Sequence, residues 1–362
     1  MTLEFTLTRS AQPVAGDTRQ GVLAEPGFGR HFTDHMVSID WTVDGGWHDA
    51  RVEPYGPLQM DPASAVLHYG QEIFEGMKAY RRANGSVWTF RPEENAKRMQ
   101  RSAARLALPQ LPVDDFVEAV RQLVEVDEAW VPEGGENSLY LRPFMIANEV
   151  FLGVRAAQTV RFMVIASPAG PYFAGGVKPV SIWLSTEYNR AGKGGTGAAK
   201  CGGNYAASLL PTQQAAENGC AQVLFLDESG SDLEELGGMN VVLVKADGTL
   251  VTPESESILD GVTRNSLLQL AADAGHTVER RPVTLSEWRD GVADGSITEA
   301  FACGTAAVLT PIAALKSPDE VIGDPDAPAG PVATSLRKQL TDIQYGRADD
   351  RHGWMHRLTG AR

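Results

Sequence analysis

Residues 194–208 read GGTGAAKCGGNYAAS and carry the most specific pattern in the chain. Lys200 stands at the centre of this segment, surrounded by glycine and alanine. A surface lysine needs no such neighbours, whereas a lysine whose amine is approached closely by a ligand does. Partial burial among apolar neighbours lowers the pKa of an amine, as a lysine that forms a Schiff base requires. The alternative, which composition alone favours, is a flexible glycine loop with an exposed lysine.

The same loop contains a second pattern, because residues 192–197 read GKGGTG and match the dinucleotide-binding fingerprint G-x-G-x-x-G. The fingerprint requires its glycines directly at a strand-to-helix turn, so that the helix N-terminus faces the pyrophosphate. Here seven mainly polar residues separate Leu184, the last apolar residue of the preceding strand, from Gly192. A nicotinamide-dependent dehydrogenase therefore stays only as the weaker alternative.

Length and charge narrow the class of protein. The chain has 362 residues with a formal net charge of −14, and 43% of its residues are hydrophobic. The length predicts two domains with a sizeable buried core. The negative charge argues against an extended nucleic-acid surface, which requires clustered lysine and arginine. We therefore expect no nucleic-acid partner.

Cysteine content and hydropathy indicate the compartment. The three cysteines, Cys201, Cys220 and Cys303, are not closely paired, which fits a reducing environment better than a disulfide scaffold. The N-terminal segment lacks a basic stretch followed by an apolar one, so no secretory signal is expected. No apolar run approaches the roughly 18 residues that cross a bilayer. We expect a cytoplasmic protein without a membrane partner.

The order of expected elements predicts an α+β (α/β) fold of two domains. A proline- and glycine-rich stretch, residues 167–177, suggests the boundary. The domains are expected at 1–170, a small α/β domain, and 180–362, a larger domain, joined by a linker at 171–179. Strands are expected at 36–41, 50–60, 74–82, 86–90, 138–146, 160–167, 180–184, 221–226, 239–245 and 250–252, and helices from Pro92 and at 113–131, 205–218, 263–274 and 331–343.

Six segments together resemble one family. GGTGAAKCGGNYAAS, EELGGMN, DGVTR, ACGTAA, HYGQEIFEGMKAYR and SLYLRP are similar to the corresponding segments of branched-chain amino-acid aminotransferases. The resemblance covers residues 25–358. It implies a fold type IV enzyme with a small N-terminal α/β domain, a larger C-terminal pseudo-barrel domain, pyridoxal 5'-phosphate as cofactor, and a homodimer. D-amino-acid aminotransferase and aminodeoxychorismate lyase share this fold, and they stay as alternatives, as does a non-catalytic carrier of the cofactor.

The resemblance also implies cofactor-binding residues. Lys200 would be the catalytic residue and form the internal aldimine, while Lys193 would be a solvated loop residue. Glu235 would keep the pyridine nitrogen protonated, so that the ring accepts electrons from the substrate. Its neighbours Asp232 and Glu234 are expected to be solvated. The remaining cofactor contacts implied are Tyr205 at the ring oxygen, and Arg98, Val262, Thr263 and Thr305 at the phosphate.

For the substrates, the resemblance implies an aromatic wall that suits leucine, isoleucine and valine. Tyr140 and Arg142 are two residues apart on an expected strand, so their side chains share one face. Arg142 could then meet the second carboxylate of glutamate. The expected reaction is a reversible ping-pong transfer of the amino group to 2-oxoglutarate. The substrate-binding residues implied are Tyr69, Phe74, Tyr140, Arg142, Tyr172 and the N–H of Ala306.

Neither a metal site nor a disulfide switch is expected. The pairs His31/His35 and His352/His356 have i, i+4 spacing, but neither has a glutamate after its first histidine or a nearby cysteine. Mammalian members of the family carry Cys-x-x-Cys after the Gly-Thr-Ala turn. Here residues 305–310 read TAAVLT, which excludes a switch at that place.

Overall fold

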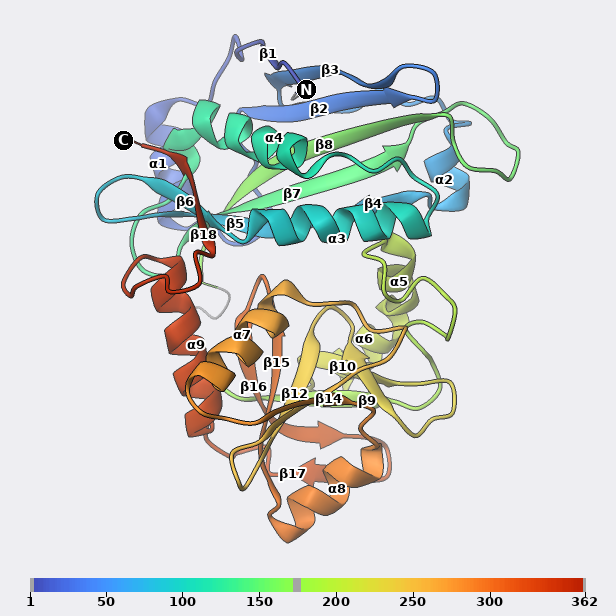
Figure 1. The fold of residues 1–362 in the computed structure, drawn as a ribbon, viewed down its shortest axis with the longest axis vertical. Helices are drawn as coiled ribbons and strands as arrows, with labels where there is room; N and C mark the ends of the chain where they lie inside the picture. The colour runs from blue at the N-terminus through green and yellow to red at the C-terminus, as the bar shows by residue number, and fades with distance from the viewer. Residues whose placement is uncertain (1–2, 172–176, 361–362) are drawn as a thin grey trace. The chain divides into compact units, whose positions relative to one another are not determined.

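The computed structural model describes residues 3–171 and 177–360, which fall into two compact units (Figure 1). Unit 1 extends to residue 172 and also includes residues 199–202 and 343–362. Unit 2 consists of residues 173–198 and 203–342. The chain therefore leaves unit 2 for four residues around Lys200 and then returns. The predicted division at 171–179 differs from these units, because it assigns residues 199–202 and 343–362 to the second domain.

Unit 1 is built on one sheet of nine strands among the described residues. The strand order is β1-β3-β2-β8-β7-β5-β6-β18, and β4 also pairs with β7. Most pairs are antiparallel, which accounts for strands that join through short turns. The bounds are β1 Thr6–Leu7, β2 His35–Thr42, β3 Gly46–Pro54, β4 Glu72–Phe74, β5 Met77–Arg81, β6 Val87–Phe90, β7 Ser138–Ala147, β8 Thr159–Ala169 and β18 Met355–Thr359.

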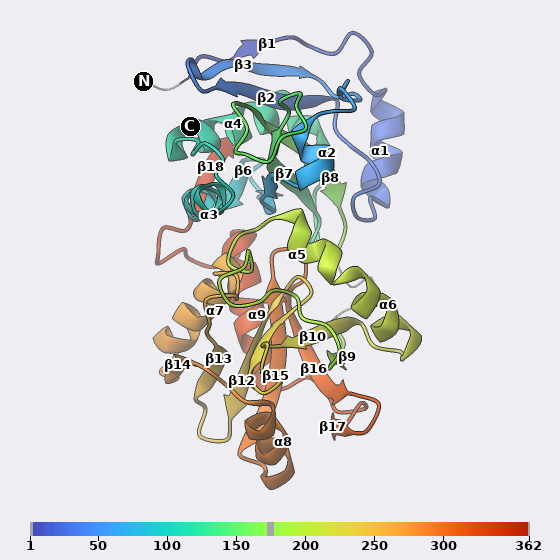
Figure 2. The same ribbon diagram turned by 90° about the vertical axis from the view of Figure 1, so that its right-hand side faces the viewer.

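Helices α3 (Pro92–Arg105) and α4 (Val113–Val126) lie along this sheet, as Figures 1 and 2 show. Helix α3 begins at Pro92, whose missing N–H costs nothing in a first turn. The apolar side chains of the two helices pack with those of the sheet in one core. The shorter helices of unit 1 are α1 (Gly16–Ala24), α2 (Ala65–Tyr69) and the 3₁₀ turn Glu128–Trp130.

The predicted strand 74–82 is divided into β4 and β5 at Glu75 and Gly76. The partner strand β7 has Pro143 opposite this point, and the N–H of Glu75 donates to its carbonyl at 2.7 Å. Proline has no N–H to return the bond, so the ladder is interrupted here. The side chain of Glu75, at this break, is fully buried.

The C-terminal strand β18 belongs to the first sheet, where it pairs antiparallel with β6. Met355 lies opposite Phe90, and Arg357 lies opposite Trp88. An uncovered edge strand exposes unpaired N–H and C=O groups, and β18 satisfies those of β6. This pairing explains why the described residues from 343 onward belong to unit 1.

Unit 2 contains a second sheet of nine strands in its described part, ordered β11-β10-β9-β16-β15-β12-β13-β14, with β17 beside β16. Strand β11 stands at one end of this order, yet its Leu236 N–H bonds to Met239 in the turn before β12. The sheet therefore curls back toward itself. The bounds are β9 Val180–Ser185, β10 Gln222–Leu226, β11 Leu233–Leu236, β12 Asn240–Lys245, β13 Leu250–Pro253, β14 Val278–Arg281, β15 Ile297–Gly304, β16 Val308–Lys316 and β17 Val321–Gly323.

The helices of unit 2 differ from the prediction at two places, because one predicted helix is divided and the helix at residues 285–294 was not predicted. The predicted helix 205–218 is divided into α5 (Gly202–Ala207) and α6 (Leu209–Glu217), because Pro211 cannot donate to the carbonyl four residues earlier. Helices α7 (Val262–Asp273) and α9 (Pro331–Gln344) lie within one residue of their predicted bounds, and α8 spans Leu285–Asp294. Among the described residues, no helix has the length and apolar character that a membrane span requires.

Candidate active site

The segment of Lys200 is attached to unit 1 by backbone hydrogen bonds. The N–H of Lys200 donates to Ser102 Oγ on α3 at 2.9 Å, and its carbonyl accepts from the N–H of Phe74 at 2.9 Å. Two residues later, the N–H of Gly202 donates to the carboxylate of Glu72. These bonds fix the segment on both sides of the lysine, so Lys200 is not part of a loose glycine loop.

The Lys200 amine lies in a cluster of charged and aromatic groups. Its Nζ is 4.7 Å from the centre of the Phe74 ring, and the Arg142 guanidinium carbon is 4.8 Å from the same ring. Burial, followed by the positive charge of Arg98, lowers the pKa of Lys200 to about 8. The charges of Glu75 and Tyr140 oppose this effect in part. About a tenth of the amine is therefore neutral and nucleophilic at pH 7, far more than at the ordinary pKa of 10.5.

Tyr140 and Arg142 share one face of β7, as predicted. Arg142 Nη2 donates to Tyr140 Oη at 3.0 Å, and the Nε of Arg142 is buried without a hydrogen-bond partner in the described part of the chain. Gly76 lets this pair approach the backbone, since a Cβ at that position would lie 2.2 Å from Tyr140 Oη. An unsatisfied, buried guanidinium N–H is suited to donate to a carboxylate ligand.

Arg98 is buried on α3 and forms a bidentate ion pair with Glu75. Its Nε lies 2.8 Å from Glu75 Oε1, and its Nη2 lies 2.7 Å from Oε2. Asn95 Nδ2 donates to the same Oε2 at 2.8 Å. Arg98 is thus no ordinary surface arginine. In the sequence, Glu75 had no predicted role at the site, and it was notable only as part of Glu75-Gly76-Met77 in the segment HYGQEIFEGMKAYR, which favours the branched-chain enzyme over its alternatives.

One predicted substrate-binding residue of unit 1, Tyr69, is not in this cluster. Tyr69 ends α2, has an exposed fraction of 40%, and donates its hydroxyl to the carbonyl of Leu152. Tyr172 lies outside the described residues, so its predicted role is neither supported nor contradicted. Unit 1 therefore gathers Phe74, Arg98, Tyr140, Arg142 and Lys200 at one place.

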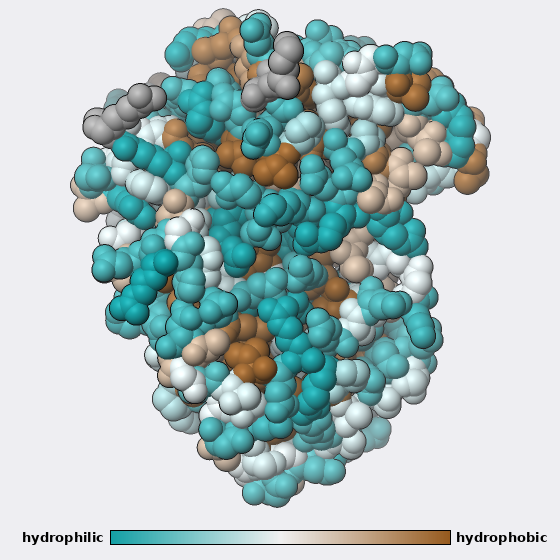
Figure 3. Space-filling view, in the orientation of Figure 1, coloured by the Kyte–Doolittle hydropathy of each residue, from teal (hydrophilic) through white to brown (hydrophobic). Residues whose placement is uncertain are grey.

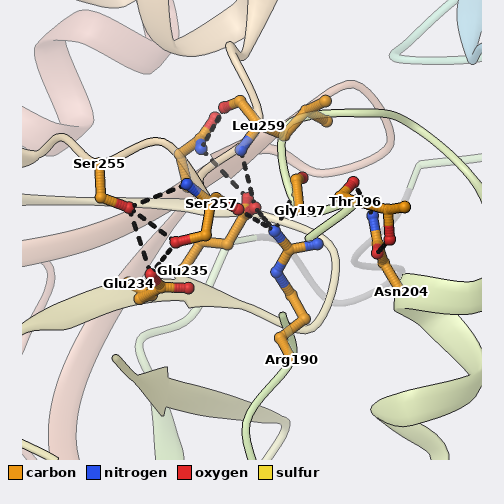
Figure 4. A network of polar contacts seen from close by, with 10 residues as sticks. Arg190, Thr196, Gly197, Asn204, Glu234, Glu235, Ser255, Ser257 and Leu259 are labelled. Atoms are coloured by element: carbon orange, nitrogen blue, oxygen red, sulfur yellow. Dashed lines mark hydrogen bonds and ion pairs between the residues drawn. The ribbon is translucent and has the colours of Figure 1, made fainter. Parts of the chain in front are cut away.

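In unit 2, Glu235 on β11 is buried and held by three groups (Figure 4). Arg190 Nη2 lies 2.6 Å from Glu235 Oε1, and the N–H of Leu259 donates to the same oxygen at 2.9 Å. Asn240 Nδ2 is 3.3 Å from the second carboxylate oxygen. A cation at this distance stabilises the carboxylate anion. Sequence reasoning assigned no role to Arg190, which lies 45 positions before Glu235, or to Asn240, which ends the segment EELGGMN that contains Glu235.

Glu234 is buried, so the prediction that it is solvated is wrong. Its Oε1 accepts from Ser255 Oγ at 3.2 Å and from Ser257 Oγ, and its Oε2 has no partner among the described residues (Figure 4). Burial raises the pKa of Glu234. Glu234 is buried because residues 255–257 cover β11. A run of acidic residues in the sequence gives no sign of such a contact. Asp232, two residues earlier, is half-buried.

Helix α7 presents backbone donors next to the Glu235 network. Val262 and Thr263 form its first turn, and Gly261 caps it without a side-chain hydrogen bond. A Cβ at position 261 would lie 1.9 Å from Asn240 Oδ1, so this helix start packs directly on the amide that contacts Glu235. Free N–H groups and the helix dipole at such a start favour an anion.

Tyr205 and Thr305 lie near the turn between β11 and β12. A Cβ on Gly238 would be 3.6 Å from the Tyr205 ring, and one on Gly304 would be 3.4 Å from Met239. Thr305 and Ala306 follow Gly304 at the end of β15. Unit 2 thus gathers Tyr205, Glu235, Val262, Thr263, Thr305 and Ala306 around the ends of these strands.

The glycine-rich loop does not form a dinucleotide-binding turn. Four residues lie between Gly197 and the start of α5 at Gly202, so no helix begins at the glycines. A Cβ at position 197 would lie 2.1 Å from the Ser257 carbonyl oxygen, which shows that this glycine permits close packing of two loops. Lys193 in the same loop is exposed.

The predicted histidine pairs make other contacts. His35 Nδ1 lies 2.7 Å from Asp127 Oδ1, and His356 Nδ1 lies 3.1 Å from Glu93 Oε1. In the described ranges, no group of three or more histidine, cysteine, aspartate or glutamate residues could hold a metal ion. The three cysteines are buried and free.

Comparison with known proteins decides the family. The model of the family "Amino-transferase class IV" matches residues 72–315. This chain is a class IV aminotransferase. The range includes both groups of candidate residues, from Phe74 to Ala306. The fold class and the family that the sequence predicted are confirmed, and so is an enzyme of the aminotransferase type.

Relatives of this aminotransferase are similar over almost the whole chain. The branched-chain-amino-acid aminotransferase of Mycolicibacterium smegmatis is 58% identical, and that of Mycobacterium tuberculosis H37Rv is 56% identical, each alignment covering 98% of both chains. Among solved structures, the Escherichia coli branched-chain amino acid aminotransferase has a TM-score of 0.74 at 27% identity, covering 89% of this chain and 100% of that one. The Thermobaculum terrenum branched-chain amino acid aminotransferase in its PLP form has a TM-score of 0.73 at 25% identity, covering 90% and 99%.

Proposed function

We propose that this class IV aminotransferase transfers the amino group of L-leucine, L-isoleucine or L-valine to 2-oxoglutarate with pyridoxal 5'-phosphate as cofactor. The observation that carries the proposal is the Lys200 amine, which is fixed at both backbone sides and has a pKa of about 8. The names of the mycobacterial relatives, together with identities above 50%, support the branched-chain substrates.

The residues of both units fit the chemistry of this cofactor, which supplies an aldehyde for an amine and a ring that withdraws electrons. Lys200 offers a partly neutral amine, and Glu235 offers an anion that the Arg190 cation stabilises. The start of α7 offers uncapped N–H groups for a phosphate. We propose that Lys200, Arg98, Tyr205, Glu235, Val262, Thr263 and Thr305 hold the cofactor.

Several residues of the two units have defined tasks in the proposed reaction. Lys200 removes a proton from the α-carbon of the amino acid and returns it later. Glu235 stabilises a positive charge on the pyridine nitrogen. Arg142 binds the carboxylate of glutamate, while Phe74 and Tyr140 contact the aliphatic side chains of the branched-chain substrates. The proposed substrate-binding set keeps the predicted Tyr69, Tyr172 and Ala306.

Spectroscopy and turnover test the function. The purified chain with cofactor is expected to show a visible absorption band that L-leucine changes, and to convert L-leucine and 2-oxoglutarate to a 2-oxo acid and glutamate. Lys200→Ala should remove both signals, whereas Lys193→Ala, at an exposed lysine of the same loop, should keep both. A cofactor adduct on Lys193 after borohydride reduction would reverse the assignment, and a response to D-alanine instead of L-leucine would indicate the D-amino-acid enzyme.

We further propose that the chain forms a homodimer through an apolar patch of unit 1. Leu67 on α2 and Val150, Leu152 and Val154 in the loop before β8 are exposed by between 57% and 88%. Tyr69 connects α2 to this loop through its bond to Leu152, and Figure 3 shows apolar side chains on the lobe at the upper right. Exposed patches of this kind indicate a protein contact. Light scattering of the purified chain tests the dimer, and the cytoplasm stays the predicted location.

A further inference from the structure

Glu75 is a buried carboxylate to which the proposed reaction assigns no task. Its exposed fraction is 0%, and it lies between β4 and β5 where Pro143 interrupts the ladder. An ionised carboxylate in such a place is costly unless several donors satisfy it. Three donors do so here, two from Arg98 and one from Asn95. Apolar residues in place of both partners would often serve stability equally well, so the pair invites a functional explanation.

The geometry of the pair restricts the orientation of Arg98. Both contacts of the guanidinium with Glu75, through Nε and Nη2, are between 2.7 and 2.8 Å. Two parallel bonds to a planar fork define its plane and direction, which a single contact cannot do. Asn95 and Arg98 are three residues apart on α3, so both side chains leave the same face of the helix toward Glu75.

Glu75 also changes the charge balance around the Lys200 amine. The charged or titratable groups of unit 1 that act on this amine are Arg98 and Arg142, which disfavour its proton, and Glu75 and Tyr140, which favour it. The carboxylate of Glu72 accepts from Gly202, two residues along the same segment. Without the charge of Glu75, two arginines would act on the amine with little opposition.

We propose that Glu75 is a positioning residue that orients the Arg98 guanidinium and offsets its charge at the Lys200 amine. The inference rests on the proposed function, in which Arg98 binds the cofactor phosphate and Lys200 carries the cofactor. A bidentate carboxylate achieves both effects at once, because it holds the cation in one direction and neutralises most of its field.

Two substitutions separate the effects. Glu75→Gln keeps the size of the side chain and removes its charge, whereas Glu75→Asp keeps the charge and shortens the reach to Arg98. Two quantities are measured on the full chain: the pH midpoint at which Lys200 of the cofactor-free protein is acetylated, read by peptide mass spectrometry, and the Kd for pyridoxal 5'-phosphate. Asp40→Asn is the matched control, since Asp40 pairs with Arg51 and Arg161 in the same unit.

We expect Glu75→Gln to lower the acetylation midpoint of Lys200 by about one pH unit, on the scale of one neighbouring charge. We expect Glu75→Asp to leave the midpoint near that of the unsubstituted chain and to weaken cofactor binding roughly tenfold, as the loss of one charge-assisted hydrogen bond implies. Asp40→Asn should change neither quantity. Thermal melting identifies any variant that does not fold.

Several results would overturn the inference. One is an unchanged acetylation midpoint of Lys200 in a folded Glu75→Gln variant. Another is unchanged cofactor affinity in Glu75→Asp. If Glu75→Gln does not fold, the cofactor affinity of Glu75→Asp alone decides. Equal changes in Asp40→Asn would show a general effect on unit 1 and would also overturn it. Failure of the proposed function looks different, because the unsubstituted chain would then carry no reducible cofactor adduct on Lys200.

Discussion

The lowered pKa of Lys200 predicts that this residue destabilises the cofactor-free protein at neutral pH. In the unfolded chain the amine has its ordinary pKa of 10.5, and in the folded chain burial and the charge of Arg98 lower it to about 8. The folded chain therefore binds the proton less tightly than the unfolded chain. The resulting loss in the free energy of unfolding is largest below pH 8, and it falls away as the pH rises through 10.5.

The size of the effect follows from the two pKa values. A pKa difference of one unit corresponds to about 1.4 kcal/mol, so the full cost is roughly 3 kcal/mol at pH 7. At pH 10 the folded-state amine is almost fully neutral while most of the unfolded-state amine is still protonated, and the remaining cost is about 1 kcal/mol. Replacement of Lys200 by methionine, which is of similar length and cannot be charged, removes this pH-dependent term.

Urea unfolding of the cofactor-free protein measures the effect. Lys200→Met should unfold with a free energy larger than that of the unsubstituted chain, and the difference should shrink by about 2 kcal/mol between pH 7 and pH 10. A constant contribution from altered packing cancels in this comparison. Lys193→Met, at an exposed site, should show no pH-dependent difference. A difference that is equal at both pH values would refute a lowered pKa for Lys200.

Two further predictions concern turnover. Glu235→Gln should bind the cofactor but transaminate roughly 10²–10³-fold more slowly, since a neutral amide cannot hold a positive charge on the pyridine nitrogen. A near-normal kcat would exclude this role for Glu235. The control is Glu256→Gln, which changes an exposed carboxylate beside Ser257. Arg142→Met should impair the glutamate half-reaction by about one to two orders of magnitude in kcat/KM, and the leucine half-reaction much less, because a charge-assisted contact is lost. Single-turnover kinetics of each half-reaction measure this, and equal losses would mean that Arg142 binds a group common to both substrates.

The sequence by itself determined the features that depend on neighbours along the chain. Pro92 marks the start of α3, and the two-residue period of a strand places Tyr140 and Arg142 on one face of β7. The small residues around Lys200 left two interpretations open, a lysine approached by a ligand and a flexible loop, whereas the order of six segments identified the family. Helix starts and strand alternation depend on neighbouring residues, and the order of motifs is read along the chain, so the amino-acid sequence alone is sufficient to predict these features.

Tertiary structure alone decided which distant groups meet. Glu75 forms an ion pair with Arg98, 23 residues away in the sequence, and Arg190 forms an ion pair with Glu235, 45 positions away. Glu234 is buried because residues 255–257 cover it, and β18 joins the first sheet because β6 is an open edge. The sequence shows the same residue type whether a carboxylate is solvated or paired with a guanidinium. Its charge, partner and pKa are set by the desolvation and by the cations that folding brings to it, and no local pattern encodes these.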